Sequence, residues 1–117
     1  MVHLTLFRDG DVPEVMHTPD QILSGAPAIR YRVHDVGEDG RLLAGEWSAG
    51  VGAWRVNYTE WEFCHMIAGR ARLIEDGAAP VEVEVGDAFT IRPGFVGVWE
   101  VTEPMRKHFV VLEQPKR

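Results

Sequence analysis

Short runs in which apolar and polar residues alternate fill most of this 117-residue chain. The clearest run is Val81-Glu82-Val83-Glu84-Val85, which, when extended, turns its valines to one side and its glutamates to the other. Glycines and prolines separate such runs at roughly the eight- to twelve-residue spacing of short strands. The pattern therefore predicts an all-β domain, a sandwich or barrel of antiparallel strands.

Turn signals divide the chain into separate expected strands. Asp76-Gly77 supplies the positive-φ residue that a tight hairpin needs, and Glu38-Asp39-Gly40 does the same earlier in the chain. Further turns are expected at 48–50, 92–94 and Glu103-Pro104. The strands between these turns are expected at 29–33, 41–47, 53–58, 62–68, 71–74, 81–85, 88–91, 96–101 and 107–112.

One segment near the start has the features of a short helix. Thr18 is a candidate N-cap, Pro19 stands at the first helical position and Gln21 at the third. Ser24-Gly25 would end this helix after barely two turns. We therefore expect a single domain, with an N-terminal arm over residues 1–28 that contains the helical turn and a barrel over residues 29–117.

Composition and charge narrow the classes of function. Hydrophobic residues make up 45% of the chain, and 12 basic against 18 acidic residues give a net charge of −6. A nucleic acid or an anionic membrane would require a clustered positive surface, so neither partner is expected. We expect a small-molecule ligand instead.

Several features predict a soluble cytoplasmic protein. Cys64 is the only cysteine, which excludes an intrachain disulfide and a cysteine-rich zinc site. No apolar run approaches the ~20 residues of a membrane span. The start of the chain, residues 1–5, also lacks the order of basic, apolar and small residues typical of a signal peptide.

The stretch from Tyr58 to Gly69 is the most informative part of the sequence. As a strand it would place Glu62, Cys64 and Met66 on one face and the odd-numbered residues 63–67 on the other. Both faces are largely apolar, so we expect one in the barrel interior and the other in the interface of a homodimer. An inward Glu62 must then meet a cation, a metal or a proton, because an unpaired buried carboxylate is costly.

Several side chains are candidates to meet this carboxylate. Lys107 is the obvious counter-charge, either in a structural ion pair or as the anchor of a substrate carboxylate. Arg55 and Arg72 are alternative structural partners. If the site is catalytic, Glu62 would act as acid or base, Lys107 as an electrostatic clamp and Tyr58 as a proton relay.

Tryptophans are numerous for so small a domain, at four in the chain. A buried indole with a partnered N–H can form the wall of a ligand pocket as well as part of a core. Trp99 is the strongest pocket candidate, because Gly97 on the same strand face is expected to leave open space beside it. The candidate ligand-binding residues are Trp99, Trp47, Cys64, Arg55 and Met66.

The histidine spacing argues against a metal site built by the protein. None of the five histidines forms a His-x-His or His-x-x-x-His pair, so no metal and no other cofactor is predicted. One alternative stays open, because Glu60 shares a strand face with Glu62 and a carboxylate pair can bind an oxygen-preferring metal. Cys64 has no partner visible in the sequence and is more typical of apolar packing than of a nucleophile.

Two motifs resemble those of the cupin family. Glu62 with Gly69 is similar to the end of the first cupin motif, and the segment 86–94 is similar to the second. With 21–25, 45–47, Tyr58, Trp99 and 106–107, the pattern resembles the small single-domain cupins of cupin type 3, which are grouped with (S)-ureidoglycine aminohydrolase. The resemblance implies an RmlC-like jelly-roll barrel, usually dimeric, with its ligand site in the barrel mouth.

The same resemblance implies where metal ligands would lie. The paired histidines of metal-binding cupins fall on Val56 and Tyr58, or on Arg55 and Asn57, and the histidine of the second motif falls on Gly97. Against the ligand set of the aminohydrolase, the aligned positions are Val56, Tyr58, Glu62 and Gly97. Only Glu62 remains, and this pattern cannot rebuild the manganese site of that enzyme.

Three functions stay open at this point. They are a metal-independent enzyme acting on a small polar metabolite such as a ureide or a sugar, a binding or sensing module without turnover, and a dimerisation domain. We rank binding or conversion of a small polar metabolite first, because an inward carboxylate costs stability that a plain core would keep. A metal-dependent enzyme, similar to ureidoglycine aminohydrolase or modifying sugars, is the alternative.

Overall fold

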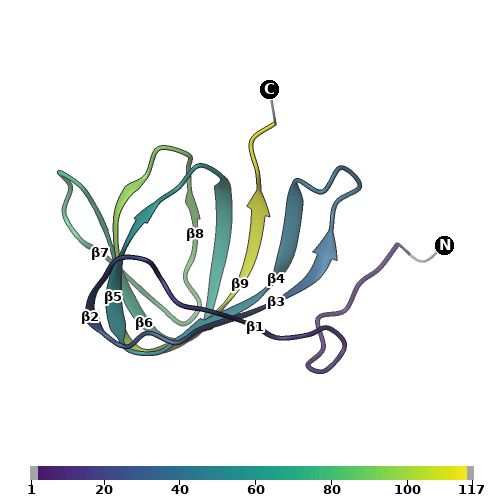
Figure 1. Ribbon diagram of the computed structural model, residues 1–117, viewed down its shortest axis with the longest axis horizontal. Helices are drawn as coiled ribbons and strands as arrows, with labels where there is room; N and C mark the ends of the chain where they lie inside the picture. The colour runs from purple at the N-terminus through teal and green to yellow at the C-terminus, as the bar shows by residue number, and fades with distance from the viewer. Residues whose placement is uncertain (1–2, 116–117) are drawn as a thin grey trace.

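Nine β-strands make up the described part of the chain, residues 3–115, in a computed structural model (Figure 1). These residues form no helix, so none of them belongs to a helix that could cross a membrane. The strands are β1 (Val15–His17), β2 (Ile22–Gly25), β3 (Ile29–Val36), β4 (Leu42–Ala49), β5 (Gly52–Asn57), β6 (Trp61–Glu75), β7 (Val81–Glu84), β8 (Ala88–Ile91) and β9 (Val96–Leu112).

The two long strands β6 and β9 organise the sheet. They pair antiparallel from Trp61↔Leu112 to Glu75↔Gly97. On the other side of β9, its first half pairs with β5 and its second half with β4. The sheet therefore curls over, and Figure 1 shows an open trough with β2, β5 and β7 on one side and β3 and β4 on the other.

A glycine permits the bend in the middle of β6. The register of β6 against β9 shifts between Met66 and Ala71. Gly69 lies in this stretch with a φ of +81°, and an added Cβ would collide with the carbonyl oxygen of Pro104 on β9. Only glycine combines this backbone conformation with such a close approach. The bend turns the inner faces of the two halves of each long strand toward one another.

Apolar side chains fill the inside of the curled sheet. Trp54, Met66, Trp99, Val101 and Met105 are all nearly inaccessible to solvent. They come from β5, β6 and β9, at the inward positions of the period-two alternation. Burial of each large apolar side chain contributes about 1.5–3 kcal/mol to the free energy of folding. The core thus lies in the bend of the trough.

The expected N-terminal helical turn is wrong. Ile22–Gly25 forms strand β2, which pairs antiparallel with β5. The carbonyl oxygen of Gln21 also accepts a hydrogen bond of 2.9 Å from the backbone N–H of Arg55. Two helical turns are too short to be stable alone, whereas an edge position on β5 supplies the backbone partners. Strand pairing therefore overrides the capping signals.

The expected turn at Glu103-Pro104 is also wrong, because β9 continues through it. Pro104 lies where β9 crosses from its partner β5 to its partner β4, opposite the register shift of β6. No neighbouring strand needs its missing N–H there, so proline is tolerated within the strand. The expected strands 62–68 and 71–74 are one strand, β6, which continues through Gly69. The turns at 38–40, 76–77 and 92–94 are confirmed. The turn expected at 48–50 is displaced, because β4 continues to Ala49 and the connection to β5 is residues 50–51.

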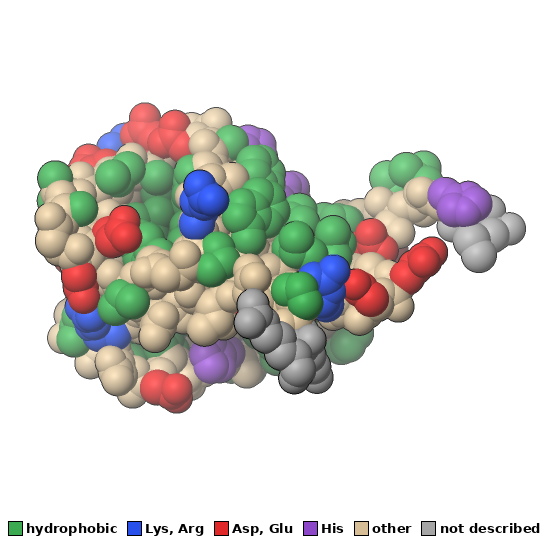
Figure 2. All heavy atoms as spheres, turned by 90° about the horizontal axis from the view of Figure 1, so that it is seen from above, with side chains coloured by type: hydrophobic (Ala, Val, Ile, Leu, Met, Phe, Trp, Pro, Cys, Tyr) green, Lys and Arg blue, Asp and Glu red, His purple; other side chains and the backbone are tan. Residues whose placement is uncertain are grey.

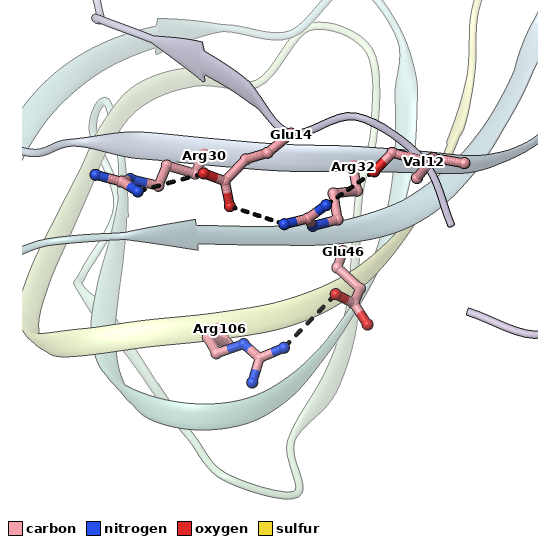
Figure 3. Close-up of polar contacts among 6 residues, drawn as sticks. All are labelled: Val12, Glu14, Arg30, Arg32, Glu46 and Arg106. Carbon is pink, nitrogen blue, oxygen red and sulfur yellow. Dashed lines mark hydrogen bonds and ion pairs between the residues drawn. The ribbon is translucent and has the colours of Figure 1, made fainter. Parts of the chain in front are cut away.

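Polar contacts attach the N-terminal segment to the outside of the trough (Figure 3). Glu14 accepts hydrogen bonds from Arg30 and Arg32, at 3.3 and 3.4 Å. Arg32 also donates to the carbonyl oxygen of Val12 at 2.8 Å. On the same outer face Arg106 lies 3.6 Å from Glu46. These charged groups are on the outer face of the sheet, so they do not line the inside of the trough.

Candidate functional site

A cavity of about 440 Å³ lies inside the trough. Figure 2 looks into the opening and shows hydrophobic side chains gathered along the middle of this face. Aromatic residues of four strands form much of the wall, with polar side chains at the base and at the open end. The aromatic wall residues are Tyr31, Trp47, Trp54, Trp99 and Phe109, and the polar residues are His17, Asn57, Tyr58, Glu60, Glu62, Lys107 and Glu113.

Glu62 and Lys107 form an ion pair at the base of this cavity. Glu62 stands near the start of β6, and Lys107 lies on the inner face of the neighbouring strand β9. The Lys107 Nζ lies 3.1 Å from Oε2 of Glu62. Only 2% of the Lys107 side chain and 8% of the Glu62 side chain are exposed. Water therefore competes little with this pair.

A chain of hydrogen bonds completes the surroundings of Glu62. The Tyr58 hydroxyl donates to Oε1 of Glu62 at 2.7 Å and accepts from Nε1 of Trp99 at 3.1 Å. The loop 94–95 fixes Tyr58, because the Tyr58 backbone bonds to Gly94 and Phe95. Each carboxylate oxygen of Glu62 thus receives a donor from the protein itself.

The Lys107 ammonium has further partners besides Glu62. Its Nζ donates to Sγ of Cys64 at 3.4 Å. It also lies 4.5 Å from the ring centroid of Trp47 and 4.5 Å from that of Trp99. Both distances are within the range in which an aromatic face attracts a cation. The ammonium is therefore held between two indoles, a carboxylate and a thiol.

The surroundings keep three of these groups protonated at neutral pH. Burial is the largest single effect on the pKa of Lys107 and lowers it, but the charges of Glu62 and Cys64 and the hydrogen bonds to both together outweigh burial, and the pKa is raised. Burial raises the pKa of the Cys64 thiol to about 12. Burial, and then the charge of Glu62, raise the pKa of Tyr58 well above its ordinary value. Cys64 is therefore a thiol rather than a thiolate nucleophile, and Tyr58 is a hydrogen-bond donor rather than a base.

Comparison with known proteins identifies the family of this barrel. The model of the EutQ-like cupin domain family, cupin type 3, matches residues 36–109. The chain belongs to this family. A comparison with curated proteins finds no significant match.

Solved structures show the same fold at low sequence identity. A DUF861-family protein of unknown function from Pseudomonas syringae has a TM-score of 0.77 at 21% identity, over 88% of this chain and 46% of that one. The EutQ protein of Clostridium difficile has a TM-score of 0.65 at 20% identity, over 74% and 63% of the two chains. A putative ethanolamine utilization protein Q from Salmonella typhimurium has a TM-score of 0.68 at 14% identity, over 96% and 94%. The match covers less than two thirds of the first two proteins.

The EutQ-like cupin domain brings most of the predicted site residues together. Glu62, Lys107, Tyr58, Trp99 and Trp47 all line the cavity. Cys64 lies behind them, in contact with Lys107 and itself fully buried. Their catalytic and ligand-binding roles remain predictions.

Two predicted site residues lie elsewhere. Arg55 does not line this cavity, and its guanidinium forms two hydrogen bonds with Asp76, at 2.9 and 2.7 Å. Met66 is completely buried in the core below the cavity. The alternation along β5 already indicates the position of Arg55, because its neighbours Trp54 and Val56 are the inward residues.

Gly97 has a different role from the expected one. An added Cβ there would collide with the carbonyl oxygen of Ile74, so the glycine allows β9 to approach the backbone of β6 and leaves no open space beside Trp99. The sequence reasoning also missed Tyr31, Trp54 and Glu113 as lining residues. Alternation along β3 and β5 could have identified the first two as inward residues, but Glu113 follows the last strand and has no such signal.

The residues present do not fit the ligand set of a metal-binding cupin. Val56, Tyr58 and Gly97, at the implied ligand positions, offer no imidazole or carboxylate, and both oxygens of Glu62 already accept hydrogen bonds. Within residues 3–115 no three His, Cys, Asp or Glu side chains are grouped so that they could hold a metal ion. The cation that contacts Glu62 in this cupin domain is the Lys107 ammonium.

Proposed function

We propose that this cupin domain binds a small polar metabolite in the cavity inside the trough, and that it does so without a metal. The observation that carries the proposal is the pairing of Glu62 with Lys107 at the base of an aromatic-walled cavity. The volume of about 440 Å³ lies in the range of small-molecule sites. Aromatic walls with a few convergent polar groups are typical of such sites.

The energetics support a binding role over a purely structural one. A buried ion pair is often no more stabilising than apolar side chains of similar volume, because both charges lose their hydration. A domain that required only a stable barrel would gain little from Glu62 and Lys107. Their position at the base of an open cavity is explained if they orient a polar ligand.

The hydrogen bonding favours binding over catalysis. Tyr58 donates to Glu62, Trp99 donates to Tyr58, and Lys107 donates to Glu62 and Cys64. A general base must exchange a proton with the substrate, whereas Glu62 is held by Tyr58 and Lys107 and only 8% of its side chain is exposed. An activity like that of ureidoglycine aminohydrolase would require a ligand set that these residues do not provide. We therefore infer a binding or sensing module without turnover.

The test is a ligand screen with a blocked cavity as the control. Protein dialysed against a chelator is titrated with ureides, sugars, small carboxylic acids and small amines, and binding is followed by tryptophan fluorescence. Val56→Phe places a ring in the cavity and should abolish binding, whereas Val98→Phe on the outward side of β9 should leave it intact. Equal binding by both variants, or binding only after metal is restored, would overturn the proposal.

A further inference from the structure

The charges around the cavity do not balance. Three carboxylates line it, those of Glu60, Glu62 and Glu113, but Lys107 is the only lysine or arginine that lines it in the described part of the chain. Lys107 is bound to Glu62. Glu60 and Glu113 take part in none of the ion pairs formed within residues 3–115. Among residues 3–115, no lysine or arginine side chain thus pairs with the two carboxylates at the open end of the cavity.

The surroundings of Glu60 disfavour the negative charge of its carboxylate. Its side chain is only partly accessible, and burial raises the pKa of its carboxyl group, with further raising contributions from the charges of Glu62 and Glu113. A positive charge placed at the open end would offset both effects. A negative charge placed there would add to them, because like charges repel strongly where water is partly excluded.

The walls also favour a cation. Tyr31, Trp47 and Trp54 present aromatic rings to the cavity, and aromatic faces attract ammonium groups. The cavity already holds one such group, since the Lys107 ammonium lies 4.5 Å from the centroids of both Trp47 and Trp99. Among the described lining residues an anion would meet one lysine or arginine, Lys107, and Glu62 already neutralises it.

We propose that the ligand of this cavity is a small organic amine, positively charged at neutral pH, whose body packs against the aromatic walls and whose charge lies near Glu60 and Glu113. This inference rests on the proposed function and narrows it from a polar metabolite to a cation. It gives Glu60 and Glu113 a role in specificity, while the Glu62–Lys107 pair forms the base of the cavity.

Three probes that differ mainly in charge test the proposal. Benzyltrimethylammonium, benzyl alcohol and benzoate share one ring, and each is titrated into the wild-type domain with tryptophan fluorescence as the readout. We expect the ammonium to bind at least about tenfold more tightly than the alcohol, and benzoate to bind most weakly. Tighter binding of benzoate or the alcohol, or no binding of the ammonium, would overturn this inference. The proposed function is tested separately, and it fails if the wider screen finds no ligand that Val56→Phe excludes or finds binding only after metal is restored.

Charge-removing variants locate the cation. Glu60→Gln and Glu113→Gln keep the size of each side chain, and each should weaken benzyltrimethylammonium binding several-fold while leaving benzyl alcohol unaffected. Glu38→Gln is the matched control, because Glu38 is exposed in the β3–β4 turn and does not line the cavity. An equal loss in all three variants would show a general effect of net charge and would contradict the assignment.

Discussion

Two ion pairs of this barrel differ in their surroundings far more than in their geometry. Arg55 and Asp76 make two hydrogen bonds, at 2.9 and 2.7 Å, with exposed side-chain fractions of 33% and 54%. Glu62 and Lys107 make one, at 3.1 Å, with 8% and 2% exposed. Water can replace either partner of the first pair, whereas neither partner of the second can turn to water. The Arg55–Asp76 pair thus has the better hydrogen-bond geometry, but it is expected to contribute less to stability than the buried pair.

Removal of one charge inside the trough should have the largest effect. Lys107→Met leaves Glu62 buried without its cation, so we expect a loss of about 3–5 kcal/mol in the free energy of unfolding, measured by urea denaturation. The double variant Glu62→Gln with Lys107→Met removes both charges and should recover much of that loss. If the double variant were as unstable as the sum of the two single variants, the two residues would not be coupled.

Alkaline pH should also lower the free energy of unfolding, through the buried groups of the trough. The unfolded chain loses the Cys64 proton near the ordinary pKa of 9.0, whereas the folded protein keeps it up to about 12. Between these values the folded state binds more protons, so stability falls as pH rises, by up to about 1.4 kcal/mol per pH unit. The raised pKa values of Tyr58 and Lys107 add to this fall at higher pH.

Urea midpoints measured from pH 7 upward check this expectation. Cys64→Ala lacks the thiol and should show a shallower decline than the wild type above pH 9. Identical declines in the two proteins would mean that the Cys64 thiol does not contribute to the alkaline instability.

Removal of the Tyr58 hydroxyl should have an intermediate effect on the free energy of unfolding. Tyr58→Phe removes the donor to Oε1 of Glu62 and the acceptor of the Trp99 N–H. Two buried polar groups then lack a partner, and we expect a loss of about 1–3 kcal/mol. The measurement is again urea denaturation, and an unchanged midpoint would show that water or another side chain replaces the hydroxyl.

The exposed pair should have the smallest effect. Arg55→Gln removes the charge that binds Asp76, and the urea midpoint should stay within the scatter of repeated measurements, because both side chains remain hydrated. Asp76→Asn should behave in the same way. A loss comparable to that of Lys107→Met would contradict the role assigned to burial.

Much of the fold could be predicted because the alternation of apolar and polar residues along each strand matches the alternation of buried and exposed side chains. The period of β6 places Glu62 and Cys64 on one face, although it does not decide which face is inward. The alternation along β5 likewise places Arg55 on the face opposite to Trp54. The prediction of a helical turn was wrong because the same residues pair as an edge strand with β5, and this pairing is possible only once β5 is in place. Local signals do not contain that long-range pairing.

The open end of the cavity was the least predictable part. Glu113 follows β9, and its backbone N–H bonds to the carbonyl oxygen of Arg41, far away in sequence. Glu60 lies between β5 and β6, outside any regular alternation. No period relates these two carboxylates in the sequence, so only the assembled sheet shows that they line the same cavity.

The central claim is that an ammonium, and not a metal ion, neutralises Glu62 in this cupin domain. The most direct test is elemental analysis of untagged protein, purified without chelators, for manganese, iron, nickel and zinc. We predict far less than one equivalent of any of these metals per chain. One equivalent of any of them would contradict the claim and would restore a metal-dependent function to the cavity.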